Sequence, residues 1–269
     1  MDNPRYAPCR ILLEHSVPSL LWFEDAIGAY DVPTVVFDLH LIVPDIDLAA
    51  AVFSQKGWQP EPPGLYTFLL PPCAMQFSQL IEPPLQNDVT PAQDDNYLNS
   101  QEKPPRKRMV IVLMSAVEWG ISTEVLHDAS KNNHFLPTLP VLTNGLIRKL
   151  LDAPGDSSVE SHLLTMLAYL YGHSLELKAE GFEHQLDLEH QQFHLDCISG
   201  QLRLWTIPFA QHERQVREAI RAGNYTFRDC STTRTEENRP LFDDLFTLIK
   251  SRRTHVDTEG ENSDAIIKN

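Results

Sequence analysis

Two side chains that can hold a metal ion or move a proton lie two positions apart, Asp38 and His40, in the run Asp-Leu-His-Leu. Carboxylates and imidazoles serve both as metal ligands and as general acids or bases. In an extended strand, residues two apart point to the same face, so these two side chains share one. Asp45 follows at the end of the same apolar segment. We therefore predict that Asp38, His40 and Asp45 are catalytic residues.

The elements on either side of this pair have clear sequence signals. Residues 22–30 are predicted to form a helix of about two turns, because Glu24 and Asp25 lie near its start, where negative charge is favourable. Residues 34–43 are rich in β-branched and aromatic side chains and are followed by Pro44, which predicts a strand with Phe37, Leu39 and Leu41 on its apolar face.

This order of turn, helix and acid-bearing strand resembles the nucleotidyltransferase superfold, in particular its minimal, abortive-infection toxin-like branch and a set of uncharacterised fungal proteins similar to it. In that family a glycine-containing turn and helix precede a strand that reads D-L-D-L, and the paired carboxylates hold a divalent metal ion that bridges nucleotide phosphates. Residues 23–27 (FEDAI) stand at the turn and helix, and residues 38–41 (DLHL) stand at the strand. The resemblance covers residues 1–115.

The resemblance implies an α+β fold, with a nucleotidyltransferase-like mixed sheet that is flanked by helices and followed by an α-helical lobe. It also implies a nucleotide or another small-molecule substrate. A divalent metal ion, Mg²⁺, Mn²⁺ or Zn²⁺, is expected at Asp38 and His40. A third polar group is expected from Glu24, Asp25 or Glu118, which we predict to contact the substrate, or from the face of a later helix that carries His190.

Three departures from the family pattern favour altered or degenerate activity. Phe23 and Glu24 replace the turn glycines, His40 replaces the second carboxylate, and the later strand expected at residues 109–114 carries no acid. Magnesium prefers oxygen ligands, whereas an Asp and His pair suits zinc or manganese better. Two alternatives stay open: a non-catalytic pseudoenzyme that binds a small molecule or a protein, and a fungal secondary-metabolite enzyme. The tRNA-dependent cyclodipeptide synthases are one such group, although their D-D-x-x-E signature is not met at Asp243 and Asp244.

A second pair of candidate ligands lies further along the chain. His190 and His194 are four residues apart, the spacing at which one helical face offers two imidazoles to a metal ion. Gln191 and Gln192 stand between them, so the glutamate of a zinc protease is missing. The alternative is a polar helix face in which both histidines make structural hydrogen bonds.

Pattern and composition divide the chain into three parts. Residues 1–120 are predicted to form the α/β lobe, with a helix at 47–56, a strand at 65–70 and a loop or insertion at 86–105. Residues 121–230 are predicted to form a helical lobe, with helices near 141–151, 159–171, 183–197 and 211–222. Residues 231–269 are predicted to contain a short amphipathic helix and a disordered tail.

The composition bounds the partners and the compartment. The formal charge of −15 disfavours broad nucleic-acid binding, because contacts to phosphate depend on Lys and Arg. The four cysteines show no paired spacing, and neither a signal peptide nor a membrane-spanning run is evident. We therefore expect a cytoplasmic protein without membrane contact, whose protein partner the sequence does not identify.

Overall fold

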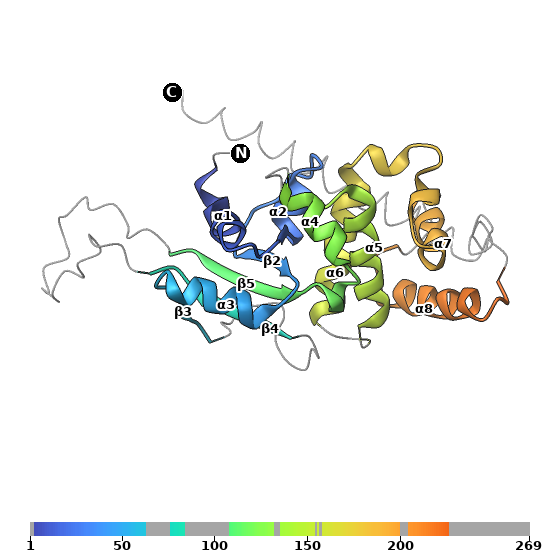
Figure 1. Ribbon diagram of the computed structural model, residues 1–269. Coiled ribbons are helices and arrows are strands. Elements are labelled where there is room, and N and C mark those ends of the chain that lie inside the picture. The colour runs from blue at the N-terminus through green and yellow to red at the C-terminus, as the bar shows by residue number, and fades with distance from the viewer. Residues whose placement is uncertain are drawn as a thin grey trace, which may run out of the picture.

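The computed structural model describes residues 3–62, 76–83, 108–131, 135–153, 155, 158–199 and 204–225 (Figure 1). Four predictions fall outside these residues: the strand at 65–70, the loop at 86–105, the C-terminal segment 231–269 and the Asp243-Asp244 pair.

The described strands form one five-stranded mixed sheet with the order β1-β2-β5-β4-β3. They are β1 (Leu20–Leu21), β2 (Leu39–Val43), β3 (Gln59–Pro60), β4 (Phe77–Ile81) and β5 (Val110–Ser115). The central strands β2 and β5 are parallel, with Leu39 opposite Ile111, and the other neighbours are antiparallel. The strand expected at residues 109–114 is thus confirmed as β5, in the middle of the sheet.

The strand expected at residues 34–43 is shorter than predicted. It begins at Leu39, and Phe37, predicted on its apolar face, is 60% exposed. The described strands offer no partner to residues 34–37, because the pairing of β2 with β5 begins at Leu39, opposite Ile111, and β1 pairs only with Leu41 and Ile42. The β-branched residues of this stretch therefore form a loop instead of a strand.

Two helices cover one face of the sheet, α1 (Ala7–Glu14) and α3 (Ile46–Gln55). Leu39 and Leu41 of β2 share a hydrophobic cluster with Leu12 of α1 and Phe53 of α3. The helix predicted at 47–56 is confirmed as α3. Its first turn is capped by Asp45, whose Oδ1 accepts a 2.9 Å hydrogen bond from the Leu48 amide.

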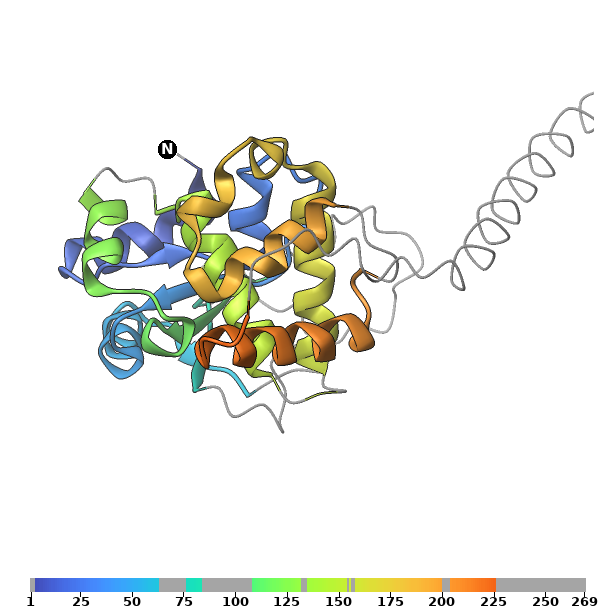
Figure 2. The same cartoon turned by 90° about the vertical axis from the view of Figure 1, so that its right-hand side faces the viewer.

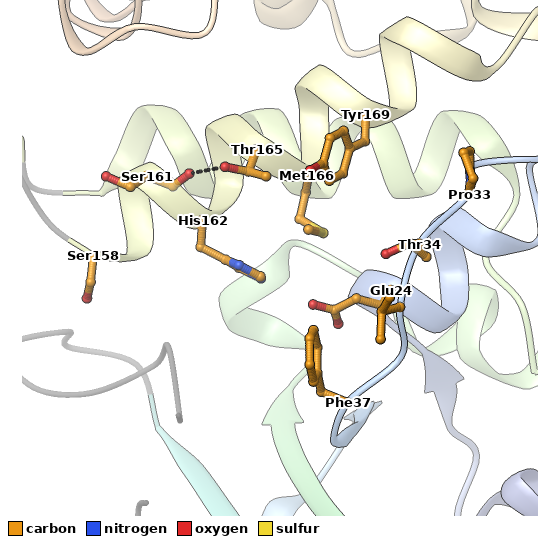
Figure 3. A pocket seen from close by; sticks show the side chains of 11 residues that line it. Glu24, Pro33, Thr34, Phe37, Ser158, Ser161, His162, Thr165, Met166 and Tyr169 are labelled. Carbon is orange, nitrogen blue, oxygen red and sulfur yellow. Dashed lines mark hydrogen bonds between the residues drawn. The ribbon is translucent and has the colours of Figure 1, made fainter. Parts of the chain in front are cut away.

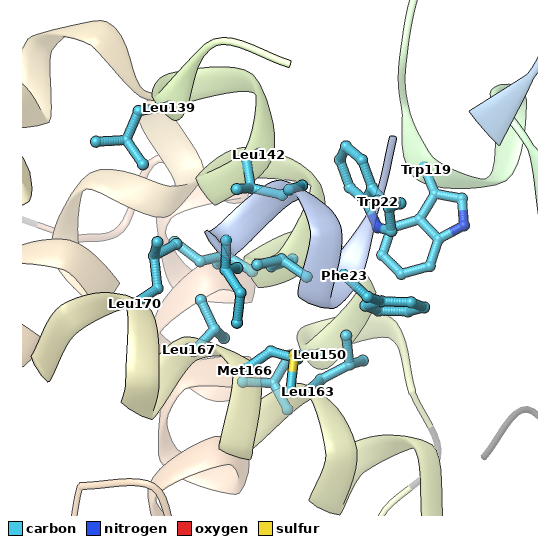
Figure 4. Close-up of a cluster of buried hydrophobic side chains, with 14 of the residues drawn as sticks. Trp22, Phe23, Trp119, Leu139, Leu142, Leu150, Leu163, Met166, Leu167 and Leu170 are labelled. Carbon is cyan, nitrogen blue, oxygen red and sulfur yellow. The ribbon is translucent and has the colours of Figure 1, made fainter. Parts of the chain in front are cut away.

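The other face of the sheet packs directly against the helical part of the chain, where strand residues and helix residues join one hydrophobic cluster (Figures 1 and 4). Ile42 and Met114 enter this cluster from the sheet, and Leu163 and Phe193 enter it from the helices. The helices here are α2 (Phe23–Gly28), α4 (Thr123–Lys131), α5 (Leu139–Asp152), α6 (Ser158–His173), α7 (Leu188–Ile198) and α8 (Ile207–Arg221).

Gly145 in the middle of α5 allows the closest approach between this helix and the region of α2. A Cβ atom at Gly145 would lie 2.8 Å from Cζ2 of Trp22, which is too close for two carbon atoms. The Trp22 ring in turn packs edge-on against Trp119, with 5.2 Å between the ring centroids (Figure 4). A glycine is therefore required where α5 meets the two tryptophans.

The coarse fold prediction is confirmed, since the chain combines a mixed five-stranded sheet with helices. Helices α5, α6 and α8 lie where helical patterns predicted them. The helix predicted at 183–197 is instead a 3₁₀ turn, Phe182–Gln185, followed by α7, because Leu186 and Asp187 have extended backbone angles. Within the described residues, no helix is both long enough and apolar enough to cross a bilayer.

Candidate acid–base pocket

Phe23 begins α2 in a conformation that is rare for a bulky residue. Its φ angle is +49°, in the left-handed region that glycine adopts more readily. The ring packs edge-on against His40 and His162, with centroid distances of 5.0 and 4.8 Å, and also against Trp119 at 5.4 Å. These contacts offset a backbone cost of about 1–2 kcal/mol. Phe23 thus separates His40 from His162 and fills the space between the sheet and α6.

Glu24 is the acid that this turn buries. The residue is 4% exposed, and its Oε2 atom has no hydrogen-bond partner among the described residues. Nδ1 of His40 lies 3.8 Å from this Oε2 atom, which is beyond hydrogen-bond range. Burial raises the pKa of Glu24, and the charges of Asp25 and Asp38 raise it further, against a backbone hydrogen bond that lowers it.

Two histidines on either side of Phe23 are held in the neutral form. Burial lowers the pKa of His40 to about 3, and the positive charges of His162 and Arg5 act in the same direction. Burial also lowers the pKa of His162 to about 4. Both imidazoles are therefore uncharged at neutral pH, and each can accept a proton or a hydrogen bond.

An open cavity of about 720 Å³ lies in front of Glu24, between the loop that precedes β2 and helix α6. Figure 3 shows the Glu24 carboxylate and the His162 ring pointing toward one another across it. The rest of the lining is mainly apolar or carries hydroxyl groups: Pro33, Thr34, Val35, Phe37, Ser158, Ser161, Thr165, Met166 and Tyr169. Val35, Phe37 and Tyr169 are exposed, so apolar side chains form the rim.

Asp25, predicted to bind substrate, has a structural role instead. Its two carboxylate oxygens accept hydrogen bonds from Nε and Nη2 of Arg5, each 2.7 Å long. The same guanidinium donates to the backbone carbonyls of Phe37 and Asp38, at 3.2 and 3.3 Å. The buried ion pair therefore ties the start of the chain to the loop at the pocket, and Asp25 has no carboxylate oxygen left without a donor.

The predicted catalytic residues are only partly brought together. His40 lies on the face of β2 that turns toward α2, and the charge of Asp38 acts on Glu24, so these three residues share one region. Asp45 lies at the other end of β2, where it caps α3. Asp45 is therefore outside the pocket lining, and the structure does not bring it together with Asp38 and His40.

Glu118, also predicted to bind substrate, lies away from the pocket lining. It follows β5, forms an ion pair with Lys149 at 3.4 Å and accepts a 2.9 Å hydrogen bond from the amide of Gln76. These contacts link the sheet to α5. Glu118 thus holds two segments together and does not face Glu24.

His190 and His194 lie on α7, on the far side of α5 and α6 from β2 (Figures 1 and 2). Both are buried, and each makes a different hydrogen bond through Nδ1, to Asn144 Oδ1 and to the Tyr171 hydroxyl respectively, both at 2.9 Å. The predicted metal set of Asp38, His40, His190 and His194 does not come together. The structural alternative for the two histidines is the one observed.

Sequence reasoning missed His162, the residue that faces Glu24. The only signal was a histidine within the apolar helical pattern at 159–171, where its neighbours pack into the core. Its role depends on the turn at Phe23, which no periodic pattern reveals. In the part of the chain that the structure describes, no cluster of three potential metal ligands includes Glu24, Asp38, His40 or His162.

The pocket therefore combines one buried carboxyl group, the neutral His162 and an apolar rim, with the neutral His40 behind Phe23. No protein-family model matches this chain, and the comparisons with curated proteins and with solved structures also give no match.

Proposed function

We propose that this pocket binds a small, largely apolar molecule with one uncharged polar group, and that Glu24 and His162 hydrogen-bond to that group and exchange protons with it. One observation carries the proposal: Oε2 of Glu24 is buried without a partner while its carboxyl group lines an open cavity. A buried acceptor without a donor costs about 1–3 kcal/mol. A bound hydroxyl, amide or amine would supply the missing donor.

The protonation states of the two groups suit acid–base chemistry near neutral pH. The raised pKa of Glu24 moves its titration toward neutral pH, and the lowered pKa of His162, about 4, favours the neutral imidazole. A carboxylic acid and a neutral imidazole that face one another across a ligand can donate and accept a proton respectively. The apolar rim gives the rest of the ligand its binding energy.

The charges around the pocket disfavour an anionic ligand. Glu24 has the negative charges of Asp25 and Asp38 nearby, and Arg5 is already paired with Asp25. The negative charges of these acids would repel a triphosphate. An uncharged ligand is therefore better supported than a nucleotide.

Nucleotidyl transfer is the second candidate, favoured by the order of α2 and β2 and by the position of Asp38 and His40 at the start of the central strand. The Phe23 ring stands between His40 and the cavity wall at His162, which limits the space for phosphates. Metal-dependent binding of ATP, CTP, GTP or UTP would favour this candidate over the first.

The two candidates are separated by ligand-observed NMR on the full chain. One arm uses small aliphatic and aromatic alcohols, ketones and amides, and the other uses the four nucleoside triphosphates with Mg²⁺ or Mn²⁺. We expect alcohols or amides to bind and triphosphates not to bind. Binding that appears only in the nucleotide arm would refute the proposal.

Matched variants test whether the ligand binds in this pocket. Thr165 lines the cavity from the exposed side of α6, so Thr165→Trp fills the cavity without entering the core and is expected to lower affinity at least about tenfold. His173→Trp, on an exposed position near the end of the same helix, is the control and should leave affinity unchanged. Glu24→Gln should keep the apolar contacts but remove the pH dependence of binding. Equal affinity in wild type and Thr165→Trp would place the ligand elsewhere.

A further inference from the structure

Helices α7 and α8 bury two carboxyl groups against one another, Asp196 and Glu213. The exposed fractions of these residues are 0% and 1%. Neither carboxylate oxygen of Glu213 meets an N–H or hydroxyl donor among the described residues, so Glu213 can hydrogen-bond to Asp196 only through a proton that the two carboxyl groups share. A buried pair of like charges is unfavourable unless a proton or a cation lies between them.

A third potential ligand completes the cluster. His212 precedes Glu213 on α8 and is exposed to solvent, and the ligand atoms of Asp196, His212 and Glu213 all lie within 4.8 Å of one another. Gln192, one turn before Asp196 on α7, donates a 2.6 Å hydrogen bond from Nε2 to Asp196 Oδ1. This bond orients the Asp196 carboxylate, as partners of metal ligands commonly do.

A bound cation would stabilise the ionised form of Glu213. Within the described residues, no lysine or arginine forms an ion pair with Glu213. A divalent cation held between the Glu213 and Asp196 carboxylates could take the place of a proton shared by the two groups.

We propose that Asp196, His212 and Glu213 form a binding site for a divalent transition-metal ion, with Zn²⁺ as the best match. Two carboxylate oxygens and one imidazole nitrogen are ligands that zinc accepts, and magnesium prefers oxygen alone. In a tetrahedral zinc site, bonds of about 2.0–2.1 Å place ligand atoms about 3.3 Å apart. The exposed side chain of His212 can rotate to close the remaining distance, and the fourth position stays open toward solvent on its side. This site is separate from the pocket at Glu24, so the two proposals stand or fall independently.

The test is a titration of the metal-free full chain with zinc chloride alone, followed by calorimetry and thermal unfolding. Zinc is expected to bind one site per chain and to raise the unfolding midpoint. At a free zinc concentration of 100 times Kd, the added stability corresponds to about 2.7 kcal/mol. Binding should also release a proton from the carboxyl pair, which is measured as a difference in heat between two buffers of unequal ionisation enthalpy.

The variants distinguish lost binding from lost folding. Glu213→Gln and Asp196→Asn each remove the repulsion and leave an amide that can hydrogen-bond across the pair, so both should fold at least as stably as wild type. Both should weaken zinc binding at least about 100-fold, and His212→Ala at least about tenfold. The exposed His173→Ala is the control and should bind zinc as wild type does.

Two results would overturn the proposal. In the first, the wild type binds no zinc at millimolar concentration, which would mean that the two carboxyl groups share a proton. In the second, zinc binds equally well to wild type, Asp196→Asn and Glu213→Gln, which would place the ion on surface histidines.

Discussion

The pocket at Glu24 and the carboxyl pair at Glu213 both bury an acid without a donor, but their surroundings differ. Glu24 faces an open cavity, with the neutral His162 across it and an apolar rim around it. Glu213 faces Asp196 between two packed helices, with only His212 toward solvent. A buried acid in front of a cavity suits an uncharged ligand, whereas a buried acid in front of another acid suits a cation or a proton. The partner of the acid, more than its burial, thus decides the chemistry.

The largest expected effect is a loss of stability in acid. The folded chain holds four histidines at lowered pKa values, about 3 for the half-buried His40 and about 4 for the half-buried His162 and the buried His190 and His194. The unfolded chain binds these protons near pH 6.5, so the free energy of unfolding should fall as pH drops from 6.5 to about 4. Each histidine contributes up to about 1.4 kcal/mol per pH unit in this window, and nothing above it.

Denaturant unfolding at closely spaced pH values measures this slope. His162→Gln should reduce the slope by the contribution of one histidine, up to about 1.4 kcal/mol per pH unit. The exposed His173→Gln should leave the slope unchanged. An equal slope in wild type and His162→Gln would mean that the folded chain does not hold His162 in its neutral form. The contrast between the uncharged pocket at Glu24 and the carboxyl pair at Glu213 would then fail.

The next effect comes from two neighbouring acids, Asp25 and Glu24, of which only the first has a cation. Arg5→Ala would leave the Asp25 carboxylate buried without its partner, and removal of one member of such a pair costs about 3–5 kcal/mol. Glu24→Gln should instead be neutral or slightly stabilising, because Glu24 forms no ion pair with a lysine or arginine among the described residues. The double variant Arg5→Ala with Asp25→Asn should recover part of the loss, as measured by urea unfolding. A small cost for Arg5→Ala alone would contradict the structural role of Asp25.

The sequence predicts the elements around the pocket better than the pocket itself. The apolar run of β5 and the periodic apolar positions of α5 and α6 are local signals, and they locate the central strand and the helices that pack on it. The start of β2 was misjudged because strand length depends on partner strands, which local composition does not show. The placement of Glu24 opposite His162 requires the left-handed turn at Phe23 and the packing of α6, so no motif predicts it.

The carboxyl pair was missed for a related reason. Asp196 lies in the same run as His190 and His194, whose regular spacing drew the metal prediction. The actual cluster joins Asp196 with His212 and Glu213, which lie on the following helix. Only the packing of α7 against α8 brings these residues together. Spacing within one helix therefore cannot reveal a cluster whose members lie on two helices.

A moderate effect on stability should distinguish Glu213 from Glu24 in alkaline solution. The pKa of Glu213 is raised to about 9 in the folded chain, against about 4.3 in the unfolded chain, so the folded state binds the extra proton between these values. Stability should fall as pH rises through this window, opposite to the effect of the histidines. Glu213→Gln should therefore stabilise the metal-free protein by about 1–2 kcal/mol at pH 8 and by less near pH 5. The measurement is the same unfolding series, and a destabilised Glu213→Gln at pH 8 would show that a cation, and not a proton, balances the pair even without added zinc.

The smallest expected effect on stability comes from Asp45, at the end of β2 that lies away from the pocket. Asp45 caps α3 through its bond to the Leu48 amide, so Asp45→Ala should cost about 1 kcal/mol of stability, and Asp45→Ser should recover most of it. Neither change should alter ligand binding, because the pocket lies at the Asp38 end of the strand. Unfolding and ligand-observed NMR on the same samples test both statements. If Asp45→Ala lost ligand affinity while Asp45→Ser kept it, the cap would also set the position of β2 at the pocket, and the two ends of the strand would act as one site.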